Sequence, residues 1–359
     1  MKVAQVCPRF PPFIGGVETH VYEISKRLAK EFEVEVLTTD PTGKLKKEEI
    51  IDGVKVKRFK VFAPSNAYFF SIGLYRYLKM NSARYDVIHA HNYHAFPALF
   101  AALTKGSKKL VFTPHYHGKG HSLFRDFLHK LYRLAGRKIF NDADAIICVS
   151  EYEKELVLNN FDVDRFKIYV IPNGIDLDEF KNIDEIKKYK NLNEKIILYV
   201  GRLEKYKGVE YIVKALSKLN DEFTLEIVGT GPYKRNIVRL ANRLGVLHRV
   251  QFFKSLSRRE LIEKYAKADV LVLLSKYEAY GLVVAEALAA ETPCIVASEA
   301  ALREWVDDRN VFGVSYPPDI DKLARLIEEV AGKKIGRRKK VKSWDNVVEK
   351  LKIIYDINI

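Results

Sequence analysis

The chain has 359 residues, 48% of them hydrophobic, which is more than one ordinary core needs and enough for two domains of the usual size. Its 30% charged and 12% aromatic residues exclude a disordered or fibrous chain. No apolar run reaches the roughly 20 residues of a membrane-spanning helix, and the start MKVAQV predicts a strand rather than a signal sequence. We therefore expect a globular, cytoplasmic protein. Its three cysteines lack the spacing of a metal site, and we expect them to be buried and inert.

The chain carries 61 Lys and Arg against 46 Asp and Glu, and the net charge of +15 favours an anionic partner. Residues 105–138 contain nine basic residues and one acid, and residues 333–342 contain seven basic residues and no acid. Within the first block, 123–140 has a helical pattern with an apolar and a basic face, so an anionic membrane surface is a candidate partner. The sequence contains no nucleic-acid recognition module. The abundance of Lys, Glu, Ile and Tyr resembles the composition of a thermophilic protein.

Short β-branched runs alternate with helical patterns, which is typical of βαβ units around parallel sheets. In the first half we expect strands at 2–7, 33–38, 54–60, 86–90, 109–113, 144–149 and 168–171. After a polar, Pro- and Gly-containing stretch, a second series is expected at 196–200, 223–228, 249–253, 269–274 and 293–297.

The two series predict an α/β protein with two doubly wound domains, residues 1–172 and 173–342. Residues 343–355 have helical spacing of apolar side chains. We expect the segment 343–359 to form a helix that crosses back to the first domain. Since ligands of open α/β sheets bind at the carboxyl ends of the strands, the loops there should carry the chemistry.

The first such loop, FPPFIGGVETH, contains Gly15 and Gly16, whose backbone amides could approach an anion at a helix N-terminus. Glycines that only shape a turn are an equally good interpretation. The loop lacks the GxGxxG pattern, which argues against an NAD enzyme.

Histidines gather after two other strands, in HAHNYH and in TPHYHGKGH. They are His89, His91, His94, His115, His117 and His121. A zinc site is one hypothesis, but no Cys or carboxylate stands at ligand spacing. Histidines hydrogen-bonded within loops are another, and a polar substrate pocket is the interpretation we favour.

Charged side chains follow the strands of the second series. In GRLEKYKG, Arg202 and Lys207 suit a diphosphate, since a guanidinium binds phosphate oxygens in a fork and an ammonium adds a point charge. Two solvated basic residues are the alternative. In YEAYGLVVAEALAA, Glu278 lies in a loop and Glu286 in an apolar helix, where a carboxylate needs hydrogen-bond donors such as ligand hydroxyls.

Taken in chain order, PPFIGGVE, DVIHAH, TPHYHG, DADAIICVSE, IPNGID, VGRLEKYKG, IVGTGP and the glutamate pair resemble the family 4 retaining glycosyltransferases, which have two Rossmann-like domains facing a cleft (GT-B). The resemblance implies that Arg202 and Lys207 bind the donor diphosphate. It adds Gly15, Gly16 and the amides around Tyr280, Gly281 and Leu282 to the donor site; these residues are part of the same motifs.

The resemblance further implies that Glu286 binds the ribose, while Glu278 and His115 act on the transferred sugar. The expected enzyme is a retaining hexosyltransferase without metal or other cofactor. It would use a nucleotide diphosphate sugar and a glycan, lipid-linked or small polar acceptor, in the cytoplasm or on the inner face of the membrane. A catalytically silent sugar-nucleotide or glycan-binding protein and a nucleotide-sugar epimerase are the alternatives. The sequence differs from the family pattern at Lys254, Glu291 and Ala300–Ala301, so the sugar and the base (UDP, GDP or ADP) stay open.

Overall fold

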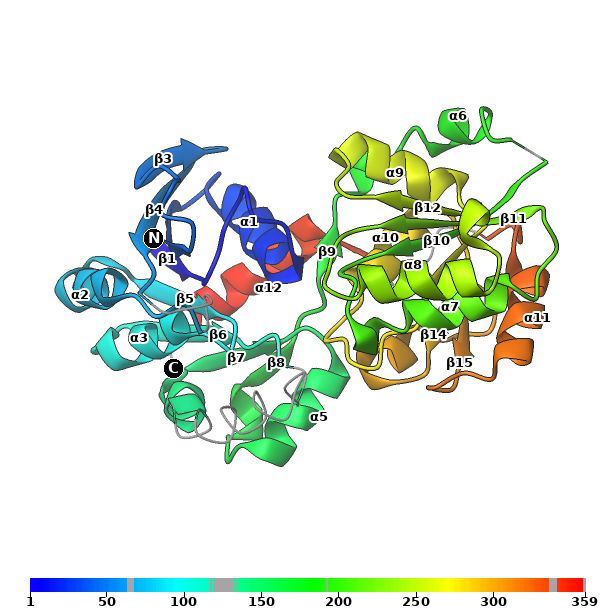
Figure 1. Cartoon of the computed structure of the whole chain (residues 1–359). Helices are drawn as coiled ribbons and strands as arrows, with labels where there is room; N and C mark the ends of the chain where they lie inside the picture. Colours follow the sequence, from blue (N-terminus) through cyan, green and yellow to red (C-terminus); the bar gives the residue numbers. More distant parts are fainter. Residues whose placement is uncertain are drawn as a thin grey trace. The chain divides into compact units, whose positions relative to one another are not determined.

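The computed structural model describes residues 1–62, 68–116, 118, 132, 135–191, 193–335 and 341–357. The chain forms two compact units. Unit 1 consists of Met1–Gly174 and Trp344–Ile359, and unit 2 of Ile175–Ser343. Each unit contains a largely parallel sheet between helices, so the prediction of two doubly wound α/β domains is confirmed (Figure 1).

Unit 1 contains an eight-stranded sheet in the order β3-β4-β2-β1-β5-β6-β7-β8. The strands are β1 (Lys2–Val6), β2 (Glu33–Asp40), β3 (Glu48–Ile51), β4 (Val54–Lys60), β5 (Val87–His91), β6 (Lys109–Thr113), β7 (Ala145–Cys148) and β8 (Ile168–Val170). All neighbours are parallel except β3, which pairs antiparallel with β4. The sequence analysis did not predict β3, because EEII has two charged residues and lies at the sheet edge.

Unit 2 contains a six-stranded parallel sheet in the order β12-β11-β10-β13-β14-β15. The strands are β10 (Lys195–Val200), β11 (Phe223–Val228), β12 (Val250–Phe253), β13 (Val270–Leu273), β14 (Cys294–Ala297) and β15 (Val311–Val314). The edge strand β15 was not predicted, because Gly313 interrupts its β-branched pattern. A Cβ at this position would overlap Ser298 Oγ, so the close packing of β15 on β14 requires this glycine. Two-residue strands, β9 (Gly174–Ile175) and β16 (Lys342–Ser343), form a separate ladder.

Helices cover both faces of each sheet (Figure 1). In unit 1 they are α1 (Gly16–Leu28), α2 (Ile72–Asn81), α3 (Phe96–Thr104), α5 (Glu151–Asn160) and α12 (Trp344–Asp356). In unit 2 they are α6 (Ile183–Lys187), α7 (Val209–Leu216), α8 (Lys234–Arg243), α9 (Arg258–Lys267), α10 (Leu282–Ala289) and α11 (Ile320–Val330). α1 packs on α12 and α2 on α3, while α7 contacts α8 and α11, and α9 contacts α6 and α10.

The C-terminal helix α12 is fixed to unit 1 by polar contacts as well as by apolar packing. The hydroxyl of Tyr355 accepts a hydrogen bond from Gln5 Nε2 at 3.1 Å and lies 2.7 Å from His89 Nδ1. Lys109 Nζ, on β6, donates to the carbonyl oxygen of Tyr355 at 3.3 Å. The last turns of the chain therefore complete the core of unit 1.

Two sequence predictions concern burial and membranes. All three cysteines are free and buried, as predicted. In the part of the chain that the structure describes, no helix is long and apolar enough to cross a membrane. The amphipathic pattern in 123–140 falls largely outside the described residues.

Two of the positions at which the sequence differs from the family pattern have left-handed backbones. Glu291, just after α10, has φ 56°, and Ala300 has φ 50°. A side chain is strained there because its Cβ approaches the carbonyl oxygen. The Glu291 carboxylate forms an ion pair with Lys187 at 3.3 Å, which offsets part of the strain.

Glu291→Gly should be more stable than Glu291→Ala by about 1 kcal/mol, because both lose the carboxylate and only glycine adopts a positive φ freely. Denaturant unfolding followed by circular dichroism measures the two variants side by side. Equal stabilities would show that position 291 is not strained.

Candidate functional site

The strand order of each sheet reverses beside its first strand. The reversal lies between β1 and β5 in unit 1 and between β10 and β13 in unit 2. At such a point the connecting chains leave toward opposite faces of the sheet and the loops open a crevice for a ligand. The predicted donor-site residues and Glu278 follow a strand beside one of these two points, and His115 follows β6, the neighbour of β5.

In unit 2 the loops after β10 and β11 pack backbone against backbone. Gly201 N donates to Val228 O at 3.0 Å, and Leu203 N donates to Thr230 O at 3.0 Å. A Cβ at Gly229 would overlap the carbonyl oxygen of Gly201. A Cβ at Gly231 would overlap the carbonyl oxygen of Leu203, so both glycines of IVGTGP are needed for this close approach.

The loop after β10 also contacts the end of β13. Gly208 has φ 68°, and a Cβ there would overlap the carbonyl oxygen of Leu274. Lys276 N donates to Tyr206 O at 2.9 Å. These contacts bring the ammonium of Lys207 to the carboxylate of Glu278, with which it forms a close ion pair.

Lys207 and Glu278 are mostly buried, with 13% and 19% of their side chains exposed. Burial alone would lower the pKa of Lys207, but the Glu278 carboxylate outweighs it, so the pKa of Lys207 is raised. Arg202 differs: its side chain is 72% exposed and lies 3.0 Å from Glu204. The Lys207–Glu278 ion pair is therefore already formed in the absence of a ligand, while the exposed Arg202 is free to reorient toward a ligand.

Glu286, on α10, has protein donors that the sequence analysis missed. Its Oε2 accepts a hydrogen bond from Tyr265 Oη at 2.8 Å, and its Oε1 pairs with Arg258. Arg258 also binds Glu179 at 2.7 Å. Both donors come from α9. The capping box at Ser257 could have indicated from the sequence that a helix begins at Arg258.

The N-terminus of α10 completes this group of residues. Gly281 is its N-cap, with φ 95°, and no side chain caps the first turn. The carbonyl oxygen of Tyr280 accepts a hydrogen bond from Trp305 Nε1 at 2.7 Å, which fixes the turn before the helix. The amides that begin at Leu282 thus form a positive helix end, as an anion site requires.

A basic hollow of about 710 Å³ lies along α8. It is lined by Gly231, Pro232, Lys234, Arg235, Val238 and Arg239. The first two residues belong to IVGTGP, so the hollow adjoins one of the loops that carry the family resemblance.

In unit 1 the helix end at Gly15 and Gly16 already has an anionic neighbour. The buried carboxylate of Glu18 lies against Gly15 so closely that a Cβ there would overlap it. Arg9 holds this carboxylate in an ion pair at 2.6 Å. A donor-binding role for Gly15 and Gly16 stays a prediction. It requires that a ligand bind at this helix end next to the Glu18 carboxylate.

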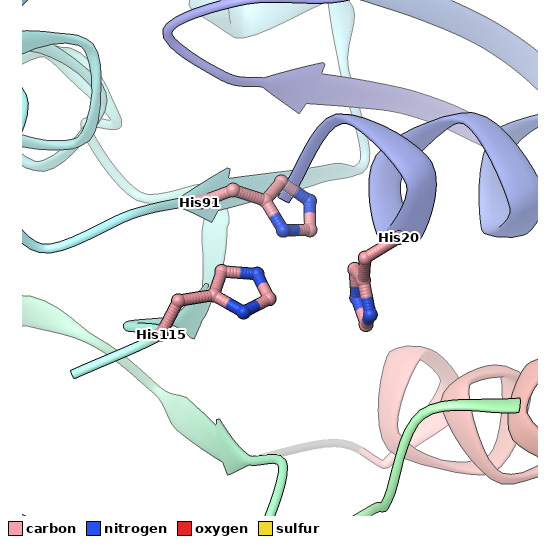
Figure 2. Close-up of side chains that lie close together, drawn as sticks. All are labelled: His20, His91 and His115. Atoms are coloured by element: carbon pink, nitrogen blue, oxygen red, sulfur yellow. The ribbon is translucent and has the colours of Figure 1, made fainter. Parts of the chain in front are cut away.

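Histidines of three segments converge at the other switch point (Figure 2). His20 comes from α1, His91 from the end of β5 and His115 from the loop after β6. The predicted grouping of His91 with His115 therefore gains His20. His89 lies beside them, with ring centroids 4.1 Å from His91. His117 and His121 lie outside the described residues.

Glu153, which the sequence analysis missed, fixes the loop that carries His115. It is fully buried in the first turn of α5 and accepts hydrogen bonds from Val149 N at 2.7 Å and from Tyr116 N. Burial raises the pKa of Glu153 to about 8, although the two amides oppose the rise.

This raised pKa makes stability depend on pH. In the unfolded chain a glutamate ionises near about 4.3, so up to about pH 8 the folded protein holds a proton that the unfolded chain has lost. The contribution of Glu153 is present at low pH and is lost as the pH rises through this window.

In the parental protein, Glu153 should lower the free energy of unfolding by up to about 1.4 kcal/mol per pH unit between pH 5 and 8. Glu153→Gln should lack this contribution to the pH dependence. Urea unfolding at several pH values measures the decline. Glu151→Gln, whose carboxylate is 63% exposed, serves as the control and should keep the parental slope. An unchanged slope in Glu153→Gln would contradict the assignment.

The chain matches two adjacent family models, Glycosyltransferase Family 4 over residues 14–179 and Glycosyl transferases group 1 over residues 180–348. An uncharacterized glycosyltransferase of Methanocaldococcus jannaschii is 29% identical over 99% of this chain and 98% of that protein. A D-inositol 3-phosphate glycosyltransferase of Xylanimonas cellulosilytica is 29% identical over 82% of this chain and 78% of its own length.

Solved structures share the fold. Sucrose-phosphate synthase from Thermosynechococcus elongatus has a TM-score of 0.80 at 21% identity, covering 99% of this chain and 98% of that one. Anabaena HepE, in complex with UDP and glucose, has a TM-score of 0.80 at 19% identity, covering 99% of both chains.

Two Rossmann-like units with loop residues gathered at their switch points define a GT-B protein. The chain belongs to family 4 of the glycosyltransferases, as its sequence motifs indicated. It is an enzyme that transfers a sugar from a nucleotide-sugar donor.

Proposed function

We propose that the protein is a retaining hexosyltransferase that binds the donor diphosphate through its own cations rather than through a metal ion. The observation that carries the proposal is the Lys207–Glu278 ion pair at the switch point of unit 2. The acceptor is a glycan, a lipid-linked sugar or a small polar molecule. His115 contacts the transferred sugar, and Gly15 and Gly16 extend the donor site.

The charges of unit 2 suit a leaving diphosphate. Lys207, Arg202 and the uncapped amides of α10 are all positive or donate hydrogen bonds. Such groups stabilise the negative charge that grows on the phosphate oxygens as the sugar–oxygen bond breaks.

The ion pair also favours a mechanism without a protein nucleophile. The ammonium of Lys207 already occupies one oxygen of the Glu278 carboxylate, so Glu278 is better suited to bind sugar hydroxyls than to attack the sugar. The bond from the anomeric carbon to the diphosphate breaks while the acceptor oxygen bonds to the same face. The proton of the acceptor hydroxyl moves to the leaving phosphate oxygen, which balances the step.

Glu286 suits the ribose. Each of its carboxylate oxygens has one protein donor, and a carboxylate oxygen can accept two hydrogen bonds, so each can still bind a hydroxyl. The complexes of HepE with UDP and with UDP-glucose make UDP and UDP-glucose the first ligands to test. GDP and ADP donors remain in the comparison, because the departures from the family pattern, Lys254 among them, leave the base open.

The two glutamates should separate binding from chemistry. Glu286→Ala should weaken both the nucleoside diphosphate and the intact donor by at least about tenfold, because each complex loses a charged acceptor. Glu278→Ala should lower kcat while diphosphate binding is kept or tightened, since Lys207 loses its competing partner. Calorimetry and a transfer assay measure the two effects.

Glu222→Gln, a surface residue of unit 2 paired with Lys195, is the matched control and should change neither quantity. Glu278→Gln and Glu286→Gln keep the size of the side chain and test whether the loop and the helix stay folded when the charge is removed. Parental transfer rates in both alanine variants would overturn the proposed mechanism.

We further propose that the basic block in 123–140 brings the enzyme to an anionic membrane surface at the inner face, where a lipid-linked acceptor would lie. Flotation with vesicles rich in phosphatidylglycerol should show binding that salt weakens. Replacing Lys130, Arg133 and Arg137 by Gln should reduce binding more than replacing Arg337, Arg338 and Lys339, which removes the same charge. No binding at low salt would reject the membrane route.

A further inference from the structure

Three buried histidines of unit 1 present ring nitrogens to one centre (Figure 2). One ring nitrogen each of His20, His91 and His115 lies within 4.8 Å of the other two. The topology explains the meeting, because β1, β5 and β6 are parallel neighbours and the three residues follow or lie near their carboxyl ends. The cluster uses no residue that unit 2 offers to the donor.

Among the residues that the structure describes, each ring has one buried nitrogen without a hydrogen-bond partner. These are Nε2 of His20, Nδ1 of His91 and Nε2 of His115. His20 and His91 are 1% and 0% exposed, so bulk water does not satisfy their nitrogens. Three buried polar nitrogens left unsatisfied at one place are costly unless a ligand binds them.

The opposite nitrogens of two rings are held by amide oxygens. His20 Nδ1 lies 2.7 Å from Asn173 Oδ1, and His91 Nε2 lies 2.7 Å from Gln5 Oε1. An amide oxygen only accepts, so the nitrogen that faces it carries the hydrogen. The remaining nitrogens of His20 and His91 are then bare lone pairs.

The amide of Gln5 is itself oriented, since its Nε2 donates to Tyr355 Oη at 3.1 Å. Its oxygen therefore faces His91. Metal-binding histidines have this arrangement, in which an outer acceptor fixes the tautomer and the ring orientation.

His115 adds a backbone observation. It has φ 48°, which is uncommon for a residue other than glycine. The buried Glu153 carboxylate, through Tyr116 N, holds the adjoining peptide. The loop conformation that carries the His115 ring to the cluster is therefore fixed by a buried contact.

We propose that His20 Nε2, His91 Nδ1 and His115 Nε2 bind one divalent transition-metal ion, for which zinc is the best match, with a fourth position open. Zinc accepts three imidazoles and one exchangeable ligand in a tetrahedron with Zn–N distances of about 2.0–2.1 Å. Ligand nitrogens in that geometry lie about 3.4 Å apart. The nitrogen–nitrogen distances between the three rings, which are at most 4.8 Å, therefore need to shorten only slightly when the ion binds.

The protonation state of the rings agrees with metal binding. Burial lowers the pKa of His20 to about 4 and the pKa values of His91 and His115 well below the usual range. Neutral imidazoles, the form that binds metals, are therefore present at physiological pH.

His89 distinguishes a ligand from a histidine that is merely buried. It is as buried as its neighbours, but both its nitrogens are engaged, Nδ1 by Tyr355 Oη at 2.7 Å and Nε2 by Thr113 Oγ1 at 2.8 Å. It offers no lone pair to an ion. His89 thus provides the matched control.

The test is a cobalt(II) titration of the full-length, untagged, chelator-treated protein, without donor or acceptor, followed by visible absorption. The expected result is one tetrahedral Co²⁺ per chain, displaced by one equivalent of Zn²⁺. His20→Asn, His91→Asn and His115→Asn should each weaken binding at least tenfold, and Gln5→Leu should weaken it about 10- to 100-fold. His89→Asn and the exposed His248→Asn should bind as the parental protein does.

Binding that is absent in the parental protein, or unchanged in all three histidine variants, would overturn the proposal. X-ray absorption of the zinc-loaded parental protein gives a test that needs no variant, and it should show three imidazoles at about 2.0–2.1 Å. Fewer imidazoles would also overturn it. Because no sugar is present, these results are independent of the transfer mechanism.

Discussion

The reversal of strand order beside the first strand of each sheet is the constraint on which the site residues depend. In unit 2 it places the loops after β10 and β13 side by side, which makes the Lys207–Glu278 pair possible. The glycines at 208 and 229 serve the same end, because the backbones approach too closely for a Cβ. In unit 1 the segments at the corresponding reversal carry three buried histidines as well as the Arg9–Glu18 ion pair.

The two switch points therefore have different electrostatics. Unit 2 offers a buried ammonium, a mobile guanidinium and a helix N-terminus, which suit an anion that carries two phosphates. Unit 1 offers neutral imidazoles in a desolvated place, which suit a metal ion or sugar hydroxyls. A metal and a sugar would use the same Nε2 of His115, so metal binding would compete with transfer.

The sequence predicted most of the fold because parallel strands buried on both faces are continuous β-branched runs, and these stand out between helical patterns. It failed at edges: β3 carries charges and β15 contains a glycine. For the site, strand-end loops indicated Arg202, Lys207 and Glu278 as residues of one site. The sequence did not reveal the hydrogen-bond donors of Glu286, nor the contribution of His20 and Glu153 to the site. Contacts between helices and strands that are far apart in the chain produce no recognisable spacing in the sequence.

The central claim is that the switch point of unit 2 binds the donor diphosphate through its cations. The most direct test is a calorimetric titration of the parental enzyme and of Lys207→Met. Each protein is titrated with UDP, GDP and ADP and, for comparison, with the corresponding nucleosides. The account predicts that one diphosphate binds far more tightly than its nucleoside and that Lys207→Met loses at least about tenfold in affinity for it. Equal binding of that diphosphate by both proteins would contradict the account.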